Sequence, residues 1–259
     1  MDLGIKGKRA LVCASSKGLG RGCAEALAEA GCSLIMNARG TEALDEAAEA
    51  IRTEYGVEVV TVAADIVDPE GRARVLAAAE GADILVTNAG GPPAGLWSDW
   101  EREDFIKALD ANMLAPIALM KALMPGMMER GWGRVVNITS RSVKSPIMPL
   151  GLSNSARAGL TGYVGGTSRQ VAGQGVTINN LLPGTHDTAR IDQMDKAVSE
   201  REGRDLSAVR EERMTSIPAG RYGTPEEFGK TCAFLCSVHA GFIVGQNIVL
   251  DGGETMITI

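Results

Sequence analysis

Short apolar runs alternate with stretches of helical period along the whole chain, and this alternation limits the folds open to it. Residues 34–36 and 84–86 are continuously apolar, as expected of strands that are buried on both faces. Strands are predicted at residues 9–14, 33–37, 57–63, 84–87, 134–138, 176–182 and 247–250. Helices are predicted at residues 18–30, 41–55, 69–79, 101–130, 153–172 and 225–236. The sequence therefore predicts an α/β, Rossmann-type, doubly wound parallel sheet of seven strands with helices on both faces.

The length of 259 residues and the absence of linkers or repeats predict a single domain, 1–259. The net charge of −6 and a pI of about 5.1, without a basic run, argue against nucleic acid or an anionic membrane as a partner. Residues 113–128 form the longest apolar stretch, and we expect it to be too short and too interrupted to span a bilayer. No apolar leader follows Met1.

The thiol and imidazole groups predict neither disulfides nor a metal site. Five cysteines, an odd number without CxxC spacing, are expected to be buried free thiols in a reducing cytoplasm. The two histidines, His186 and His239, are far apart in the sequence, which argues against a structural metal.

A glycine loop joins the first predicted strand to the first predicted helix. It contains Ser15, Ser16, Lys17, Gly18, Leu19 and Gly20. Glycines at this place let the backbone approach a pyrophosphate, which the free N–H groups and the dipole of the helix stabilise. A plain tight turn is the alternative, and the strand–loop–helix context favours the dinucleotide site.

The loop resembles the Thr-Gly-x-x-x-Gly-x-Gly loop of the short-chain dehydrogenase/reductase family, with Cys13 and Ala14 in place of the Thr and the first Gly. Further motifs match in order along the chain: Asp65, Asn88-Ala89-Gly90, Pro183-Gly184 with Thr188, Gly220 to Glu227, and Asp251-Gly252-Gly253. The last two are similar to the 3-oxoacyl-[acyl carrier protein] reductase branch. The resemblance covers essentially the whole chain.

The resemblance implies a bound nicotinamide dinucleotide. The residues it places at the cofactor are Ala14, Ser16, Lys17, Gly18, Leu19, Gly20, Arg39, Asp65, Asn88, Ala89, Gly90, Arg157, Pro183, Gly184 and Thr188. The second strand is followed by Asn37-Ala38-Arg39 and carries no acid, and Lys17 adds a second cation. This favours the 2′-phosphate of NADP over NAD, although surface salt bridges would also explain Lys17 and Arg39.

The family's catalytic positions are only half matched. Ser140 and Asn112 align with the Ser that orients the carbonyl and the Asn that holds a water. The catalytic Tyr is expected thirteen residues after Ser140, where this chain has Ser153, and the Lys four residues later, where it has Arg157. A Ser hydroxyl is a far weaker acid than a Tyr phenol, and an Arg stays protonated. Arg157 is therefore expected to hold the ribose, while the acid has no obvious replacement.

Three nearby cationic or titratable residues are weak candidates for the missing acid. His186 is expected on the nicotinamide side, with a structural role in the loop as the favoured interpretation. Lys144 and Arg141 follow Ser140, and Lys144 is more simply a solvated charge. Tyr163 lies six residues past Arg157 and is interpreted as a packing residue rather than a displaced catalytic Tyr.

Two hypotheses of different classes follow. The first is an NADP(H)-dependent oxidoreductase that acts on a small-molecule carbonyl or alcohol, such as a 3-oxoacyl thioester, with an altered acid. The second is a catalytically silent NADP-binding sensor or partner subunit; a non-redox lyase or isomerase has little support.

Residues 190–216 are expected to form a helical substrate lid or a solvated insertion, and residues 91–96 to line the pocket. The resemblance also implies a homotetramer or homodimer.

Overall fold

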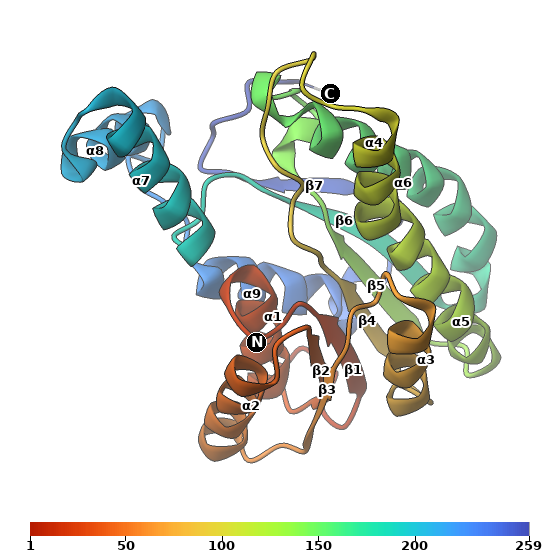
Figure 1. Cartoon of the computed structure of the whole chain (residues 1–259). Coiled ribbons are helices and arrows are strands. Elements are labelled where there is room, and N and C mark those ends of the chain that lie inside the picture. The colour runs from red at the N-terminus through yellow and green to blue at the C-terminus, as the bar shows by residue number, and fades with distance from the viewer. Residues whose placement is uncertain (259) are drawn as a thin grey trace.

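The computed structural model describes residues 1–258, in which seven parallel strands form one sheet with the order β3-β2-β1-β4-β5-β6-β7 (Figure 1). The strands are β1 Arg9–Cys13, β2 Ser33–Ala38, β3 Val59–Ala63, β4 Ile84–Thr87, β5 Gly133–Ile138, β6 Val176–Pro183 and β7 Asn247–Leu250. The predicted fold class is confirmed, and the predicted strand boundaries differ from these by two residues at most.

Helices cover both faces of the sheet (Figure 1). They are α1 Gly18–Glu29, α2 Thr41–Tyr55, α3 Pro69–Ala78, α4 Arg102–Leu109, α5 Ala115–Glu129, α6 Gly151–Val171, α7 Ala189–Glu202, α8 Leu206–Ser216 and α9 Pro225–Leu235. One hydrophobic core lies between the sheet and α1, α2 and α9, and the other lies between the sheet and α3, α5 and α6. All five cysteines are buried and free, as predicted.

The contact between α1 and α9 explains two of the many glycines. A Cβ on Gly229 would lie 2.0 Å from the carbonyl oxygen of Gly22, and a Cβ on Gly22 would lie 2.2 Å from that of Pro225. The two helix backbones therefore touch, and this contact fixes the N-terminal end of α1 on the sheet. Thr224 and Glu227 form a capping box that starts α9 beside it.

The helix predicted at residues 101–130 is interrupted by a π-helical turn, Asp110–Leu114, which the sequence pattern did not reveal. Such turns are rare in proteins, and those that occur are often found at functional sites. By length and composition alone, the helical run Arg102–Glu129 would be sufficient to cross a membrane, a property that it shares with core helices of soluble proteins. In the structure its α5 part covers the sheet as a core helix.

Helices α7 and α8 stand apart from the two layers (Figure 1). They are tied to the domain by a buried carboxylate, Asp195, which is 0% exposed and accepts a hydrogen bond from the Tyr222 hydroxyl (2.9 Å). Arg213 Nε lies 2.7 Å from the other oxygen of Asp195, although its angle is not that of a hydrogen bond. The stretch expected as one lid is thus a pair of helices clamped at their base.

Candidate active site

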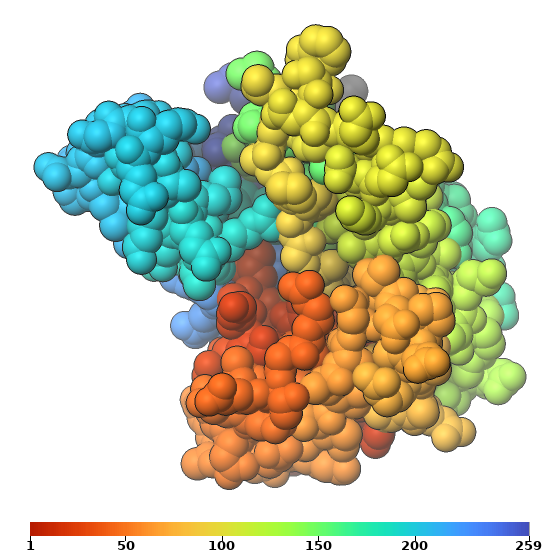
Figure 2. Space-filling view, viewed as in Figure 1, coloured from red at the N-terminus to blue at the C-terminus, as the bar shows by residue number. Residues whose placement is uncertain are grey.

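The carboxyl ends of the strands meet at the edge of the sheet where the strand order reverses between β1 and β4. In open α/β sheets this is where ligands bind. Figure 2 shows the surface hollowed there, between α7–α8 in cyan and the orange and yellow segments. The loops after β1, β4, β5 and β6 therefore converge on one cleft.

The glycine loop has the tight geometry that its sequence predicts. Gly18 has φ +58°, and a Cβ on Gly20 would lie 2.2 Å from the carbonyl oxygen of Ala14. Ala14 itself has φ +49°, which is the sole positive φ of a non-glycine among the described residues. This conformation strains an L-residue, and the family's Gly at this place would adopt it freely.

One cation follows β2 and a second lies in the glycine loop, and no acid ends β2. Lys17 and Arg39 are exposed, and within residues 1–258 neither forms an ion pair. The salt-bridge interpretation of these two residues is therefore wrong for this structure. Asn37 is buried and donates to the carbonyl oxygens of Val62 (2.9 Å) and Ala64 (3.0 Å), so it joins β2 to β3.

Two further predicted cofactor positions, Asn88 and Thr188, lie beside the glycine loop. The Nδ2 atom of Asn88 would lie 2.9 Å from a Cβ on Gly20, and a Cβ on Gly18 would lie 3.5 Å from Thr188 Cγ2. The turns after β4 and β6 therefore both meet the glycine loop. Asp65 is exposed and its side chain accepts a hydrogen bond from the Val67 N–H (2.9 Å), whereas Leu19 packs on the core side of α1.

Arg157, which the sequence aligns with the family's Lys, is a buried guanidinium. It is 7% exposed and donates from Nε to Ser153 Oγ (3.2 Å), from Nη1 to the Ile138 carbonyl (2.9 Å) and from Nη2 to the Ala89 carbonyl (3.5 Å). Burial, and then the charge of Arg190, lower the pKa of Arg157 to about 10. The side chain therefore remains a cation at neutral pH and joins the ends of β4 and β5 to α6.

Ser153 and Ser140 both keep a free hydroxyl proton in this arrangement. Ser153 Oγ accepts from Arg157 Nε, and Ser140 Oγ accepts from the Ser142 N–H (3.1 Å). Because each oxygen is held as an acceptor, its own O–H can be donated elsewhere. Two hydroxyl donors and one cation are thus available beside the end of β5.

Asn112 lies in the π-helical turn, which packs against α6. A Cβ on Gly159 of α6 would lie 2.8 Å from Met113 Sδ, so glycine permits this close approach. Asn112 is 3% exposed and donates to the Ala108 carbonyl (3.3 Å), while its Oδ1 atom is buried without a partner. A buried acceptor of this kind is what an ordered water satisfies.

The structure does not bring the three substitute acids to the catalytic positions. His186 is 3% exposed, its ring packs edge-to-face on Phe228 of α9 (5.2 Å), and desolvation lowers its pKa. The ring of His186 therefore packs against α9, which agrees with the structural role favoured from the sequence. Arg141 forms an ion pair with Glu254, and Lys144 lines a hollow at the edge of β7. Tyr163 packs against the second core, as interpreted from the sequence.

A row of polar side chains crosses the sheet beneath the cleft, and the sequence analysis missed it. Thr87 donates to Asn137 (2.6 Å), Asn137 to Asn180 (3.2 Å) and Asn180 to Asn247 (2.8 Å). These residues are register partners on β4, β5, β6 and β7. The signal that would have revealed them is a polar residue on each of four strands that are otherwise largely apolar. The row fixes the strand ends that carry the catalytic loops.

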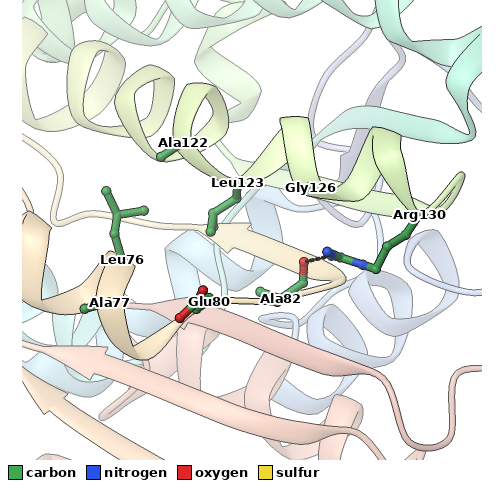
Figure 3. A pocket seen from close by; sticks show the side chains of 9 residues that line it. Leu76, Ala77, Glu80, Ala82, Ala122, Leu123, Gly126 and Arg130 are labelled. Carbon is green, nitrogen blue, oxygen red and sulfur yellow. Dashed lines mark hydrogen bonds between the residues drawn. The ribbon is translucent and has the colours of Figure 1, made fainter.

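A second hollow lies elsewhere, between α3 and α5 (Figure 3). It measures about 460 Å³, and at its edge Arg130 Nη2 donates to the Ala82 carbonyl (2.8 Å). None of the catalytic or cofactor positions lines it, so its size alone does not make it the site of chemistry.

Comparisons with known proteins agree with this geometry. A family model described as enoyl-(acyl carrier protein) reductase matches residues 13–255. The 3-oxoacyl-[acyl-carrier-protein] reductase FabG of Vibrio cholerae is 33% identical over 98% of this chain and 100% of its own length. The chain belongs to the short-chain dehydrogenase/reductase family.

Two solved structures are similar over nearly the whole chain. L-sorbose reductase from Gluconobacter frateurii, complexed with NADPH and L-sorbose, has a TM-score of 0.95 at 30% identity, with 100% of both chains covered. A 3-oxoacyl (acyl-carrier-protein) reductase from Agrobacterium tumefaciens with NADP bound has a TM-score of 0.87 at 29% identity, with 97% of this chain and 96% of that chain covered.

Proposed function

We propose that this protein is an NADP(H)-dependent oxidoreductase that reduces a carbonyl group to an alcohol, with Ser153 and Arg157 in the places of the family's Tyr and Lys. The observation that carries the proposal is the contact set of Arg157. A buried cation that holds a hydroxyl at 3.2 Å supports the proposal, because it places a positive charge beside a hydroxyl donor at the aligned positions. Burying a charge is costly, and Arg157 offsets that cost with three hydrogen bonds to neutral oxygens.

NADP fits the residues of the cleft. Gly18 and Gly20 leave room for the pyrophosphate, and Lys17 and Arg39 supply cations for the 2′-phosphate that no acid neutralises. The relatives crystallised with NADPH or NADP support the same assignment, with NAD less favoured. When bound, NADPH supplies the hydride. The residues proposed to hold the dinucleotide are those predicted from the sequence, including Asp65, Asn88, Pro183, Gly184 and Thr188.

The residues of this chain would act on the substrate oxygen. The hydroxyls of Ser140 and Ser153 donate to it, and Arg157 places a positive charge behind Ser153. Oriented donors of this kind stabilise the negative charge that develops on the oxygen as the carbonyl is reduced. Arg157 also keeps spare N–H groups for ribose hydroxyls.

The proton follows a different route from that of the family. Neither Ser153 nor Arg157 releases a proton near neutral pH, so the proton comes from water. The unpartnered Oδ1 of Asn112 is the acceptor that would hold such a water near the reacting oxygen. The loss of a positioned acid costs about 10²–10⁴-fold in rate, so we expect slow turnover.

The substrate is proposed to be a small ketone or a 3-oxoacyl thioester, with residues 190–216 as its lid and residues 91–96 at its pocket. The relatives named for 3-oxoacyl-[acyl-carrier-protein] and L-sorbose reduction support this range. We also propose a cytoplasmic homotetramer or homodimer. The exposed apolar residues Phe105, Ile106 and Leu114 on the α4–α5 segment support an assembly through these helices.

The test is oxidation of NADPH in the presence of 3-oxoacyl thioesters, diketones and ketoses. Turnover that falls about 10²–10³-fold in Ser153→Ala, the size expected for a lost oxyanion donor, would support the proposal. Ser155→Ala on the same helix is the matched control, because its hydroxyl bonds only to helix carbonyls. Tight NADPH binding without turnover of any substrate would instead favour the silent NADP-binding protein.

A further inference from the structure

Arg190 connects the base of the lid to the turn after β4. It is the second residue of α7, and a Cβ on Gly91 would lie 2.2 Å from its Nη1 atom and 2.5 Å from its Nη2 atom. A side chain at position 91 would therefore force this guanidinium to move from its place. Thr188, two residues earlier, lies beside Gly18, so Arg190 extends past the glycine loop toward the catalytic end of the cleft.

The charge of Arg190 has no carboxylate partner within residues 1–258, which distinguishes it from the cations deeper in the lid. Arg210 pairs with Asp187 (3.1 Å) and Asp192 (3.3 Å), and Arg213 pairs with Asp195 (2.7 Å). Arg190 is exposed as a residue, but its guanidinium rests on Gly91, and desolvation lowers its pKa.

Arg190 also acts on Arg157. Its charge is the second cause, after burial, that lowers the pKa of Arg157. The protein contacts of Arg157 are all neutral oxygens. The catalytic end of the cleft therefore holds two guanidinium groups that repel each other. Arg190 moreover lies in the first turn of α7, where the helix dipole disfavours a cation. An anion placed between the lid and the Gly91 turn would relieve both costs.

We propose that Arg190 is a specificity-determining residue that binds an anionic group of the substrate, a carboxylate or a phosphate, next to the carbonyl held by Ser140 and Ser153. This inference rests on the proposed reductase function and narrows it to acidic carbonyl compounds. The phosphates of the dinucleotide are the competing anions. They are expected near Gly18 and Lys17, whereas the Arg190 guanidinium lies against Gly91, two residues beyond the Ala89 carbonyl that Arg157 contacts.

The experiment measures equilibrium binding of matched probes to the complex of the protein with NADP⁺ by calorimetry. Acetoacetate is compared with its methyl ester, and dihydroxyacetone phosphate with dihydroxyacetone, so each pair shares a carbonyl and differs in charge. We expect at least one anion to bind about 10- to 100-fold more tightly than its neutral partner, the size of a charge-assisted hydrogen bond. The pair that shows the preference identifies carboxylate or phosphate as the recognised group.

Two variants and one control assign the preference to Arg190. Arg190→Gln should abolish it while NADPH affinity changes less than about twofold, and Gly91→Ala should weaken it because the new Cβ displaces the guanidinium. Arg201→Gln, an exposed cation on the same helix, should leave it intact.

Two results would overturn the inference: no preference in the unaltered protein, or a preference that survives Arg190→Gln, whatever happens to the NADPH affinity of that variant. A preference for the anion in a protein that reduces none of the carbonyls would support the anion site and contradict the proposed reductase function, so the two failures are distinguishable.

Discussion

The glycine loop and the catalytic face of α6 lie in one cleft, but they have kept the family's pattern to different degrees. In the glycine loop, Gly20 cannot carry a side chain, because a Cβ would lie 2.2 Å from a backbone oxygen. On α6, Ser153 and Arg157 lie where we propose that the family's acid and cation would be, and a hydrogen bond joins them. Backbone geometry thus limits change at Gly20, whereas we propose that at the catalytic end a different pair serves the same site.

The largest effect is expected from restoring the family's pair. Ser153→Tyr with Arg157→Lys supplies a phenol that can donate its proton, and should raise the rate of carbonyl reduction about 10²–10⁴-fold. NADPH oxidation by the purified variant checks it, with Arg169→Lys at the exposed end of α6 as the control. An unchanged rate with intact NADPH affinity would mean that the rest of the cleft has diverged as well.

The variant Gly20→Ala tests whether the glycine loop binds the dinucleotide. The new methyl group collides with the Ala14 carbonyl, so the loop must shift, and NADPH should bind about 10- to 100-fold more weakly. Cofactor fluorescence measures the affinity. Gly162→Ala on α6 is the control, since nothing lies within 4 Å of its added Cβ. Equal affinity in both variants would show that the dinucleotide does not use this loop.

The cation that follows β2 and the cation of the glycine loop should set the choice of dinucleotide. Lys17→Gln with Arg39→Gln removes both charges, and NADPH should bind roughly tenfold more weakly because its 2′-phosphate loses charged partners. NADH affinity should stay unchanged, as it should for both dinucleotides in the control Arg102→Gln. A parallel loss for NADPH and NADH would place these cations at the pyrophosphate instead.

The smallest effect concerns His186. Its pKa is lowered in the folded protein, mainly by desolvation, so below its ordinary value of 6.5 the unfolded chain binds more protons than the folded one. Stability should therefore fall as the pH decreases below about 6.5, by no more than about 1.4 kcal/mol per pH unit for one group.

Urea unfolding between pH 5 and 6.5 measures this slope above the range in which carboxylates titrate. His186→Gln should flatten it, whereas His239→Gln, at an exposed histidine, should not. A slope that persists in His186→Gln would assign the pH dependence to other groups.

The sequence allowed the sheet, the glycine loop and the alignment of Ser153 and Arg157 to be predicted, because each follows from local period or from spacing within one element. It did not allow the prediction of contacts between distant segments. The π-helical turn around Asn112 has the same apolar pattern as an α-helix. The packing of His186 on Phe228 and the contact of Arg190 with Gly91 each depend on loops that meet only in the folded chain. These contacts decide which charges face the cleft.

The central claim is that the cofactor end retains its function while the catalytic end has changed. Titration of the unaltered protein with NADPH and with NADH, followed by cofactor fluorescence, tests it most directly. We predict saturable NADPH binding, at least about tenfold tighter than NADH binding, from the charges of Lys17 and Arg39. Binding of neither dinucleotide would contradict both the reductase and the silent NADP-binding alternative, and would leave the fold alone established.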